Sequence, residues 1–104
     1  MYKIIWEYTA AKKTVKKFEL EYGPNGTWSK LFKKSPSYKK TELLKCLDKS
    51  RHYYVIDVWK SKKDYEKFKL KYQNEYCQYD LAFMELKEKE RIVGEFKDVC
   101  VKDI

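Results

Sequence analysis

His52 to Trp59 reads HYYVIDVW, and this stretch decides the fold. Its β-branched and aromatic residues predict a strand. Because successive side chains of a strand point to opposite faces, the eight residues divide into two sets. One face carries His52, Tyr54, Ile56 and Val58, and the other carries Tyr53, Val55, Asp57 and Trp59. Both sets are rich in apolar and aromatic groups, whereas a sheet with one wet face would alternate apolar and polar residues. The strand therefore needs cover on both sides.

The flanking sequence predicts two units of strand, helix and strand. Strands are expected at 2–8, 38–47, 52–59 and 90–96, one helix from an N-cap at Thr9 to Tyr22, a short helix beginning at Thr27, and a long helix from Ser61 to Leu86. The stop signal Gly23-Pro24 ends the first helix, and Asp64 is the capping-box partner of Ser61. Aromatic residues at steps of three or four run through the long helix, with a break possible near Asn74.

This order predicts an α+β, ferredoxin-like βαββαβ domain, with an antiparallel four-stranded sheet and the helices on one face. The whole chain, 1–104, is expected to be a single domain, with about 98–104 as a C-terminal tail or an added strand. Since the helices cover only one face of the sheet, a second copy is the simplest cover for the other. The sequence thus predicts a homodimer that forms an α+β barrel.

The charge distribution bears on a nucleic-acid partner, and the cysteine content bears on metal binding and on the cellular compartment. The net charge is +8, and only Arg51 and Arg91 among the 24 basic residues are arginine. The lysines are scattered through every segment, often beside glutamates, which is typical of a solvated surface and argues against a nucleic-acid partner. The three cysteines Cys46, Cys77 and Cys100 form no metal-ligand pattern and favour reduced thiols in a cytoplasmic protein. No long apolar run predicts a signal peptide or a membrane segment.

Several segments together resemble a known superfamily. They are Tyr22–Trp28 (YGPNGTW), Leu31-Phe32, Thr41–Leu44 (TELL), Tyr54–Ser61 (YVIDVWKS), Tyr65–Phe68 (YEKF) and Glu90–Phe96 with Gly94. In this order, over about residues 2 to 97, the chain is similar to one subgroup of the antibiotic biosynthesis monooxygenase superfamily. The resemblance implies a dimeric α+β barrel that needs no metal or flavin cofactor. Its members include cofactor-independent oxygenases of polycyclic phenols, quinol oxygenases and haem-degrading enzymes.

The resemblance argues against haem degradation. Haem-degrading members rely on an Asn, a Trp and a His, and this sequence matches neither the Asn of the first strand nor the His of the second long helix.

Glu42 and Asp57 are the candidate catalytic pair. A hairpin that turns between Lys49 and Ser50 would place Glu42 directly opposite Asp57. Two close carboxylates raise one pKa, and burial adds to the effect, so one of them is a candidate general base toward a phenolic substrate. The alternative is structural: each carboxylate is paired with a lysine or with a neighbour such as Thr41, and a one-residue shift in register would separate the two.

Aromatic side chains are candidate ligand-binding residues in a cavity between sheet and helices. They are Trp28, Tyr38, Tyr54 and Trp59, with Trp6 as a further candidate. Aromatics at such spacings also form ordinary cores. His52 is the only histidine and lies at a hairpin end, where solvent exposure is expected, and one histidine makes no metal site by itself.

Two classes of function remain open. The first is a monooxygenase-like protein that acts on, or only binds, a small phenol- or quinol-like molecule. The second is an RNA-binding module of the RRM kind, which shares the order of elements. RRM recognition needs a glycine-containing aromatic motif on the third strand, and HYYVIDVW lacks it. An acidic Asp57 on that strand would also repel phosphate, so the first class is favoured.

Overall fold

A computed structural model describes residues 1–101 of the chain. The strands are β1 (Tyr2–Ala10), β2 (Tyr38–Lys45), β3 (His52–Trp59) and β4 (Lys87–Lys97). The helices are η1 (Lys12–Thr14), α1 (Val15–Tyr22), α2 (Thr27–Phe32), α3 (Lys62–Lys71), α4 (Gln73–Ala82) and η2 (Met84–Leu86). Of the expected tail at 98–104, residues 98–101 form no strand, and 102–104 lie outside the described residues.

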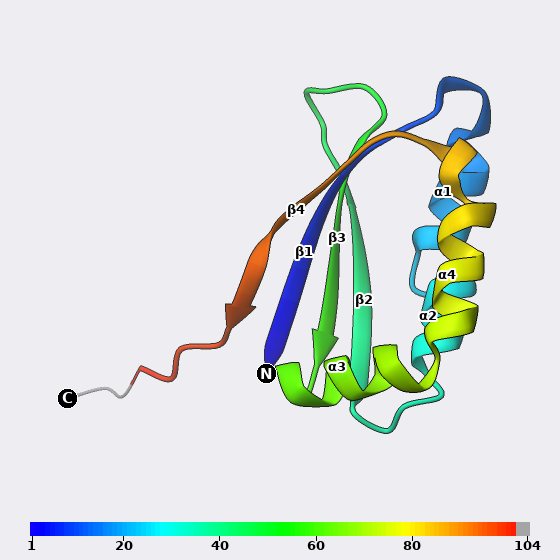
Figure 1. Cartoon of the computed structure of the whole chain (residues 1–104). Helices are drawn as coiled ribbons and strands as arrows, with labels where there is room; N and C mark the ends of the chain where they lie inside the picture. The colour runs from blue at the N-terminus through cyan, green and yellow to red at the C-terminus, as the bar shows by residue number, and fades with distance from the viewer. Residues whose placement is uncertain (102–104) are drawn as a thin grey trace.

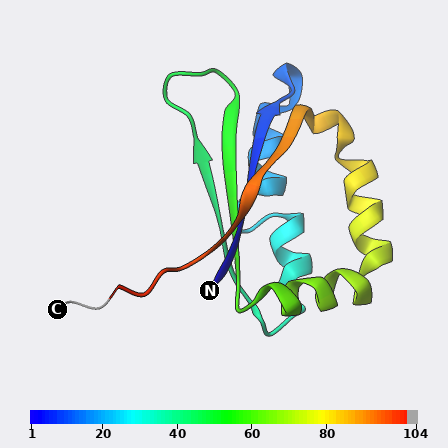
Figure 2. The same cartoon turned by 60° about the vertical axis from the view of Figure 1, so that its left-hand side comes forward.

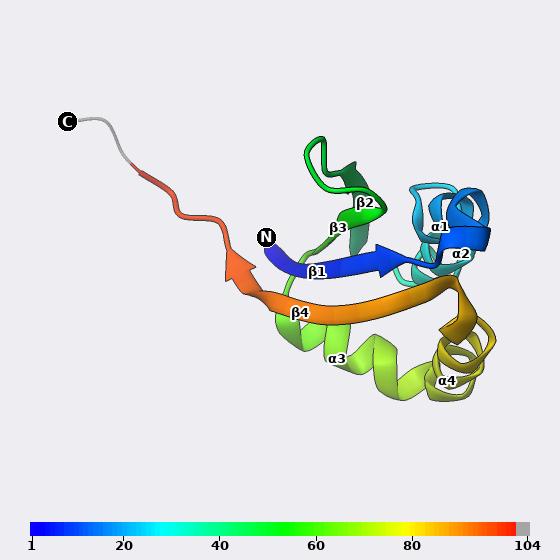
Figure 3. The ribbon, with the colours of Figure 1, turned by 90° about the horizontal axis from the view of Figure 1, so that it is seen from above.

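The four strands form one antiparallel sheet in the order β2-β3-β1-β4. All the helices lie on one side of this sheet, and the other side carries none (Figures 1 and 3). This arrangement confirms the ferredoxin-like α+β fold that the order of elements predicts. Within residues 1–101, none of the helices is long and apolar enough to span a bilayer.

The two faces of β3 have the composition that the alternation predicts. Tyr53, Val55, Asp57 and Trp59 are all buried on the helix side. On that side Tyr53, Val55 and Trp59 join alternate residues of β1 and aromatic residues of the helices in a single core. The aromatic residues of this core contact one another mostly in tilted and edge-on pairs, such as Trp59 with Phe68 at 5.1 Å between ring centroids, and Phe18 stacks on Tyr22.

The register of the β2–β3 hairpin differs from the predicted one by one residue. Thr41, and not Glu42, pairs with Asp57, while Glu42 pairs with Ile56. The predicted pairing of the two carboxylates is therefore wrong. A one-residue shift exchanges the two faces of a strand, and the observed register keeps the Glu42 carboxylate out of the core. Its side chain is 45% exposed and lies 4.0 Å from the ammonium group of Lys40.

The predicted long helix is two helices. The chain leaves helical geometry at Tyr72 (φ −110°, ψ 31°), two residues before the expected break, and α4 then leaves in a new direction (Figures 1 and 2). Ser61 caps α3 as predicted, because its Oγ accepts a hydrogen bond from the backbone N–H of Asp64 at 3.1 Å. Two smaller predictions were wrong: Thr9 lies within β1 and caps no helix, and β4 begins at Lys87 and not at Glu90.

Candidate functional site

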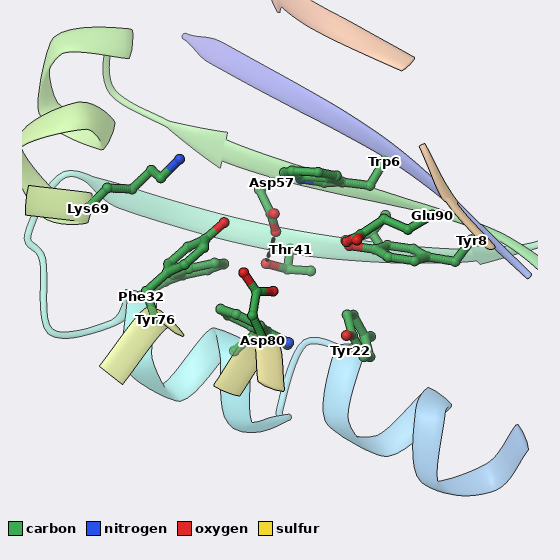
Figure 4. A pocket seen from close by; sticks show the side chains of 12 residues that line it. Trp6, Tyr8, Tyr22, Phe32, Thr41, Asp57, Lys69, Tyr76, Asp80 and Glu90 are labelled. Atoms are coloured by element: carbon green, nitrogen blue, oxygen red, sulfur yellow. Dashed lines mark hydrogen bonds between the residues drawn. The ribbon is translucent and has the colours of Figure 1, made fainter. Parts of the chain in front are cut away.

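A cavity of about 220 Å³ lies between the sheet and the helices (Figure 4). Its lining is Trp6, Tyr8, Tyr22, Trp28, Phe32, Thr41, Val55, Asp57, Lys69, Tyr76, Asp80 and Glu90. Six of these twelve side chains are aromatic rings, and four are ionisable groups other than tyrosine. An apolar cavity of about 150 Å³ is known to hold benzene, so this cavity has room for a small aromatic molecule.

Asp57 supplies a buried carboxyl group to the cavity wall. The residue is 6% exposed, and burial raises the pKa of its carboxyl group from 3.8 to about 7. Thr41 donates a hydrogen bond from its Oγ1 to Oδ1 of Asp57 at 2.7 Å. This bond and the neighbouring Trp6 lower the pKa, but by less than burial raises it. The Asp57 carboxyl group is therefore partly protonated and partly ionised near neutral pH.

A chain of hydroxyl groups holds this carboxyl group. Since Thr41 uses its single hydroxyl proton on Asp57, the Tyr38 hydroxyl is the donor in the 2.7 Å hydrogen bond between Tyr38 and Thr41. Tyr38 also packs against Trp59, with ring centroids 5.3 Å apart. Tyr38 is therefore a positioning residue behind the cavity wall. The interpretation that Asp57 is held by Thr41 was the alternative left open by the sequence.

Three further charged groups reach the cavity from the helices and β4. The Lys69 ammonium group lies 5.2 Å from the ring centroid of Tyr76, which is a cation–π contact. Burial raises the pKa of Asp80, and Glu90 completes the acidic set. In Figure 4, Lys69 and Asp80 extend toward the part of the cavity that contains Asp57. A substrate there would meet carboxyl groups and one ammonium group among aromatic rings.

The structure brings only part of the predicted site together. Asp57, Trp28 and Trp6 line the cavity. Trp59 is fully buried in the core behind it. Tyr54 lies on the opposite face of the sheet, where its hydroxyl donates to Glu7 at 3.0 Å, so its expected place between sheet and helices is wrong.

Sequence reasoning missed Lys69, Tyr76 and Asp80. Lys69 lies in α3 and Tyr76 in α4, on either side of the bend at Tyr72, so the spacing of aromatic residues along one straight helix could not show that they share a site. The sequence signal that could have found them is the presence of Lys69 and Asp80 among the regularly spaced aromatic residues of this segment.

A second polar cluster lies on the helix-free face of the sheet. There Glu7 accepts hydrogen bonds from His52 at 2.6 Å, from Tyr54, and from Arg91 at 2.8 Å. Its contact with Arg91, followed by those with Tyr54 and His52, lowers the pKa of Glu7 to about 2. His52 is paired and its side chain is only 15% exposed, contrary to the expected solvent exposure. Asp57 is absent from this face, so the argument that it repels phosphate there was wrong.

No metal-binding cluster is present in the described part of the chain, where no three His, Cys, Asp or Glu side chains are grouped suitably. The three cysteines are free thiols.

Comparison with known proteins identifies the fold. No family model and no curated protein matches the sequence. Among solved structures, a candidate antibiotic biosynthesis monooxygenase from Deinococcus radiodurans superposes with a TM-score of 0.76 at 10% identity, covering 100% of this chain and 98% of that one. The cofactor-independent oxygenase SnoaB from Streptomyces nogalater gives a TM-score of 0.71 at 17% identity, covering 96% and 94%.

A variant of MhuD, solved with two manganese protoporphyrin IX molecules per active site, gives a TM-score of 0.70 at 12% identity, with 99% of both chains covered. The chain is therefore an α+β protein with the fold of the antibiotic biosynthesis monooxygenase superfamily, as the sequence resemblance predicts. At these identities the likeness extends to the fold alone.

Proposed function

We propose that the cavity binds a small aromatic compound with an acidic hydroxyl group, and that Asp57 accepts the proton of this group. The observation that carries the proposal is the buried Asp57 carboxyl group, with a pKa of about 7, in a wall otherwise made largely of aromatic rings. A general base works best when its pKa is near the working pH. The aromatic lining supplies apolar contact area for the ring of the substrate.

Removal of the proton makes the substrate reactive toward dioxygen. The phenolate gives one electron to dioxygen, and the resulting phenoxyl radical and superoxide combine at the ring carbon opposite the oxygen. The hydroperoxide then loses water, so that one phenol and one dioxygen give one quinone and one water without an external reductant. The Lys69 ammonium group, which lines the same cavity, would stabilise the anionic intermediates. The fold shared with a cofactor-independent oxygenase supports this class of reaction.

Oxygen consumption tests this proposal. We expect the protein to consume dioxygen with a naphthol and to release the corresponding quinone, while the methyl ether of the same naphthol, which has no acidic proton, gives no uptake. The rate should rise with pH around a midpoint near 7, as Asp57 loses its proton. An oxygen electrode measures the consumption of dioxygen, and the absorbance of the quinone measures its release. Tight binding of the naphthol without turnover would instead favour a non-catalytic ligand-binding protein.

We also propose that a second copy covers the helix-free face. This face carries apolar side chains at the centre of the sheet, where Ile5 of β1 pairs with Ile56 of β3, and it exposes Leu44 and Phe96. Exposed apolar groups of this kind are typical of an interface, and a two-fold dimer would bury them against their own copies.

Light scattering across a dilution series tests the dimer. We expect a stable species of about twice the 12.7 kDa chain mass, and dissociation in Ile56→Lys, which places a charge at the centre of the interface. A monomeric wild-type chain would contradict the dimer and leave the face open to other partners. RNA binding would then be measured next with a fluorescent oligonucleotide at physiological salt.

A further inference from the structure

Two polar groups in the cavity have no partner. The hydroxyl of Tyr22 and the Nε1–H of Trp28 are buried, and neither makes a hydrogen bond within the described residues. Tyr22 is 4% exposed and Trp28 is 8% exposed, and both side chains line the cavity. An unpaired buried polar group costs about 1–3 kcal/mol, so most such groups in proteins have a partner. Because both side chains line the cavity, a ligand bound there can supply the partner.

The two groups define the chemistry of their partner. The rings of Tyr22 and Trp28 are neighbours, with centroids 6.3 Å apart. An indole Nε1–H can only donate a hydrogen bond, and a tyrosine hydroxyl can donate one. Burial raises the pKa of Tyr22 by more than the neighbouring Lys87 and Trp28 lower it, so its hydroxyl keeps its proton at neutral pH. A single oxygen atom with two lone pairs satisfies both donors, and a carbonyl oxygen is such an atom.

The two donors and Asp57 come from different layers of the molecule. Tyr22 ends α1 and Trp28 lies in α2, whereas Asp57 lies on β3 in the sheet. In Figure 4, Tyr22 rises from the helix side of the cavity and Asp57 points down from the sheet side. A bound molecule can therefore offer one oxygen to each layer.

Charge decides between a neutral carbonyl group and a carboxylate. The lining contains the carboxyl groups of Asp57, Asp80 and Glu90 and the ammonium group of Lys69. The ammonium group of Lys87, which is outside the lining, lies 3.0 Å from Oε1 of Glu90 and balances that carboxylate, so Asp57 and Asp80 face a single ammonium group. A ligand carboxylate would add a further negative charge inside a buried site, which is unfavourable. A neutral carbonyl oxygen accepts the same hydrogen bonds without this penalty.

We propose that the ligand of this cavity is a neutral hydroxy-carbonyl aromatic compound, whose hydroxyl group binds Asp57 and whose carbonyl oxygen accepts hydrogen bonds from Tyr22 and Trp28. This inference rests on the proposed function, because it takes Asp57 as the partner of the hydroxyl group. It adds the second contact and makes Tyr22 and Trp28 determinants of specificity.

Four probes of matched shape test the proposal by titration calorimetry at pH 7. They are para-hydroxyacetophenone, which has both groups, para-ethylphenol, which has only the hydroxyl, acetophenone, which has only the carbonyl, and para-hydroxybenzoate, which has a carboxylate. We expect para-hydroxyacetophenone to bind at least about fivefold more tightly than para-ethylphenol and acetophenone, since each lost hydrogen bond costs about 1 kcal/mol or more. It should also bind more tightly than para-hydroxybenzoate, whose carboxylate brings a further negative charge into the buried site. Tighter binding of para-hydroxybenzoate would overturn the neutral carbonyl.

Conservative variants assign the effect to the two donors. In Tyr22→Phe the preference for para-hydroxyacetophenone over para-ethylphenol should fall by about fivefold to tenfold. Trp28→Phe should reduce the same preference. The matched control is Tyr79→Phe, since Tyr79 contacts the Trp28 ring at 5.8 Å but does not line the cavity, and it should keep the preference.

Stability separates a binding role from a structural one. Because the Tyr22 hydroxyl has no partner in the described residues, Tyr22→Phe should melt at or above the wild-type temperature. Equal affinities of the wild-type protein for para-hydroxyacetophenone and para-ethylphenol would overturn this inference while leaving Asp57 as the base. Failure of every phenol to bind would overturn the proposed function and this inference with it.

Discussion

Asp57→Asn should make the protein more stable at pH 8 and less stable relative to wild type as the pH falls. The wild-type carboxyl group has a pKa of about 7 in the folded protein, against 3.8 ordinarily. The folded state therefore binds the Asp57 proton more tightly than the unfolded state does. The stabilisation from this proton is complete below pH 4 and is lost as the pH rises to about 7.

The expected size of this effect follows from the gap between the two values. At about 1.4 kcal/mol per pH unit, the gap corresponds to about 4 kcal/mol lost by the wild-type protein between pH 4 and pH 8. Asparagine has no charge to bury, so the variant escapes this loss. Its extra amide donor needs a partner, and we therefore expect a net gain of about 2–3 kcal/mol at pH 8. Urea unfolding at several pH values measures the difference.

The same substitution should remove turnover. An amide cannot accept the proton of the substrate, so oxygen consumption with a naphthol should fall by about 10²–10⁴-fold. Asparagine keeps the shape of the side chain and can still accept the hydrogen bond from Thr41. A variant that is more stable yet inactive would show that the buried carboxyl group is retained for chemistry and not for the fold.

Glu42→Gln is the matched control for Asp57→Asn. It also neutralises one carboxylate, but Glu42 lies on the other face of the sheet with its side chain 45% exposed. We expect neither the pH dependence of stability nor the turnover to change. If Asp57→Asn keeps full activity, Asp57 is not the base. If the two variants show the same pH dependence of unfolding, Asp57 is not the buried titrating group.

The sequence predicted the fold better than the site, and the hairpin shows why. The alternation in HYYVIDVW correctly put Asp57 on the same face as Trp59, because a period of two needs no knowledge of partners, but it did not tell which face meets the helices. The partner of Asp57 depends on the register, which the loop between β2 and β3 determines. In that loop Arg51 adopts φ of 59°, which is uncommon for a non-glycine residue. No local pattern predicted it, so the register was off by one.

The helical part of the site was missed for a different reason. A steady aromatic stripe predicts one continuous helix, yet the chain bends at Tyr72. The bend turns α4 away from the line of α3, so that Lys69 near the end of α3 and Asp80 in α4 line one cavity. Periodicity within a helix carries no information about where that helix bends, and the two side chains meet only in the tertiary structure.

Trp59→Ala should destabilise the protein by about 3–5 kcal/mol. The sequence predicted Trp59 as a ligand-binding residue, but its side chain is fully buried behind the cavity wall. Four rings surround it, at centroid distances of 5.4 Å (Phe32), 5.3 Å (Tyr38), 5.2 Å (Tyr65) and 5.1 Å (Phe68). Alanine would leave a cavity among these rings, and so closely packed a set of aromatic groups has little freedom to collapse into it.

Thermal unfolding decides between the core and the ligand-binding roles of Trp59. In a domain of this size, 1 kcal/mol corresponds to about 4–8 °C, so the melting temperature of Trp59→Ala should fall by at least about 12 °C. Leu81→Ala is the control, because Leu81 is 70% exposed on α4 and its loss should change stability by no more than about 0.5 kcal/mol. The Trp59 indole Nε1–H has no hydrogen-bond partner in residues 1–101. Its removal therefore offsets part of the free energy of unfolding that Trp59→Ala loses. If Trp59→Ala kept the wild-type melting temperature but lost phenol binding, Trp59 would belong to the site and the cavity would extend past its present wall.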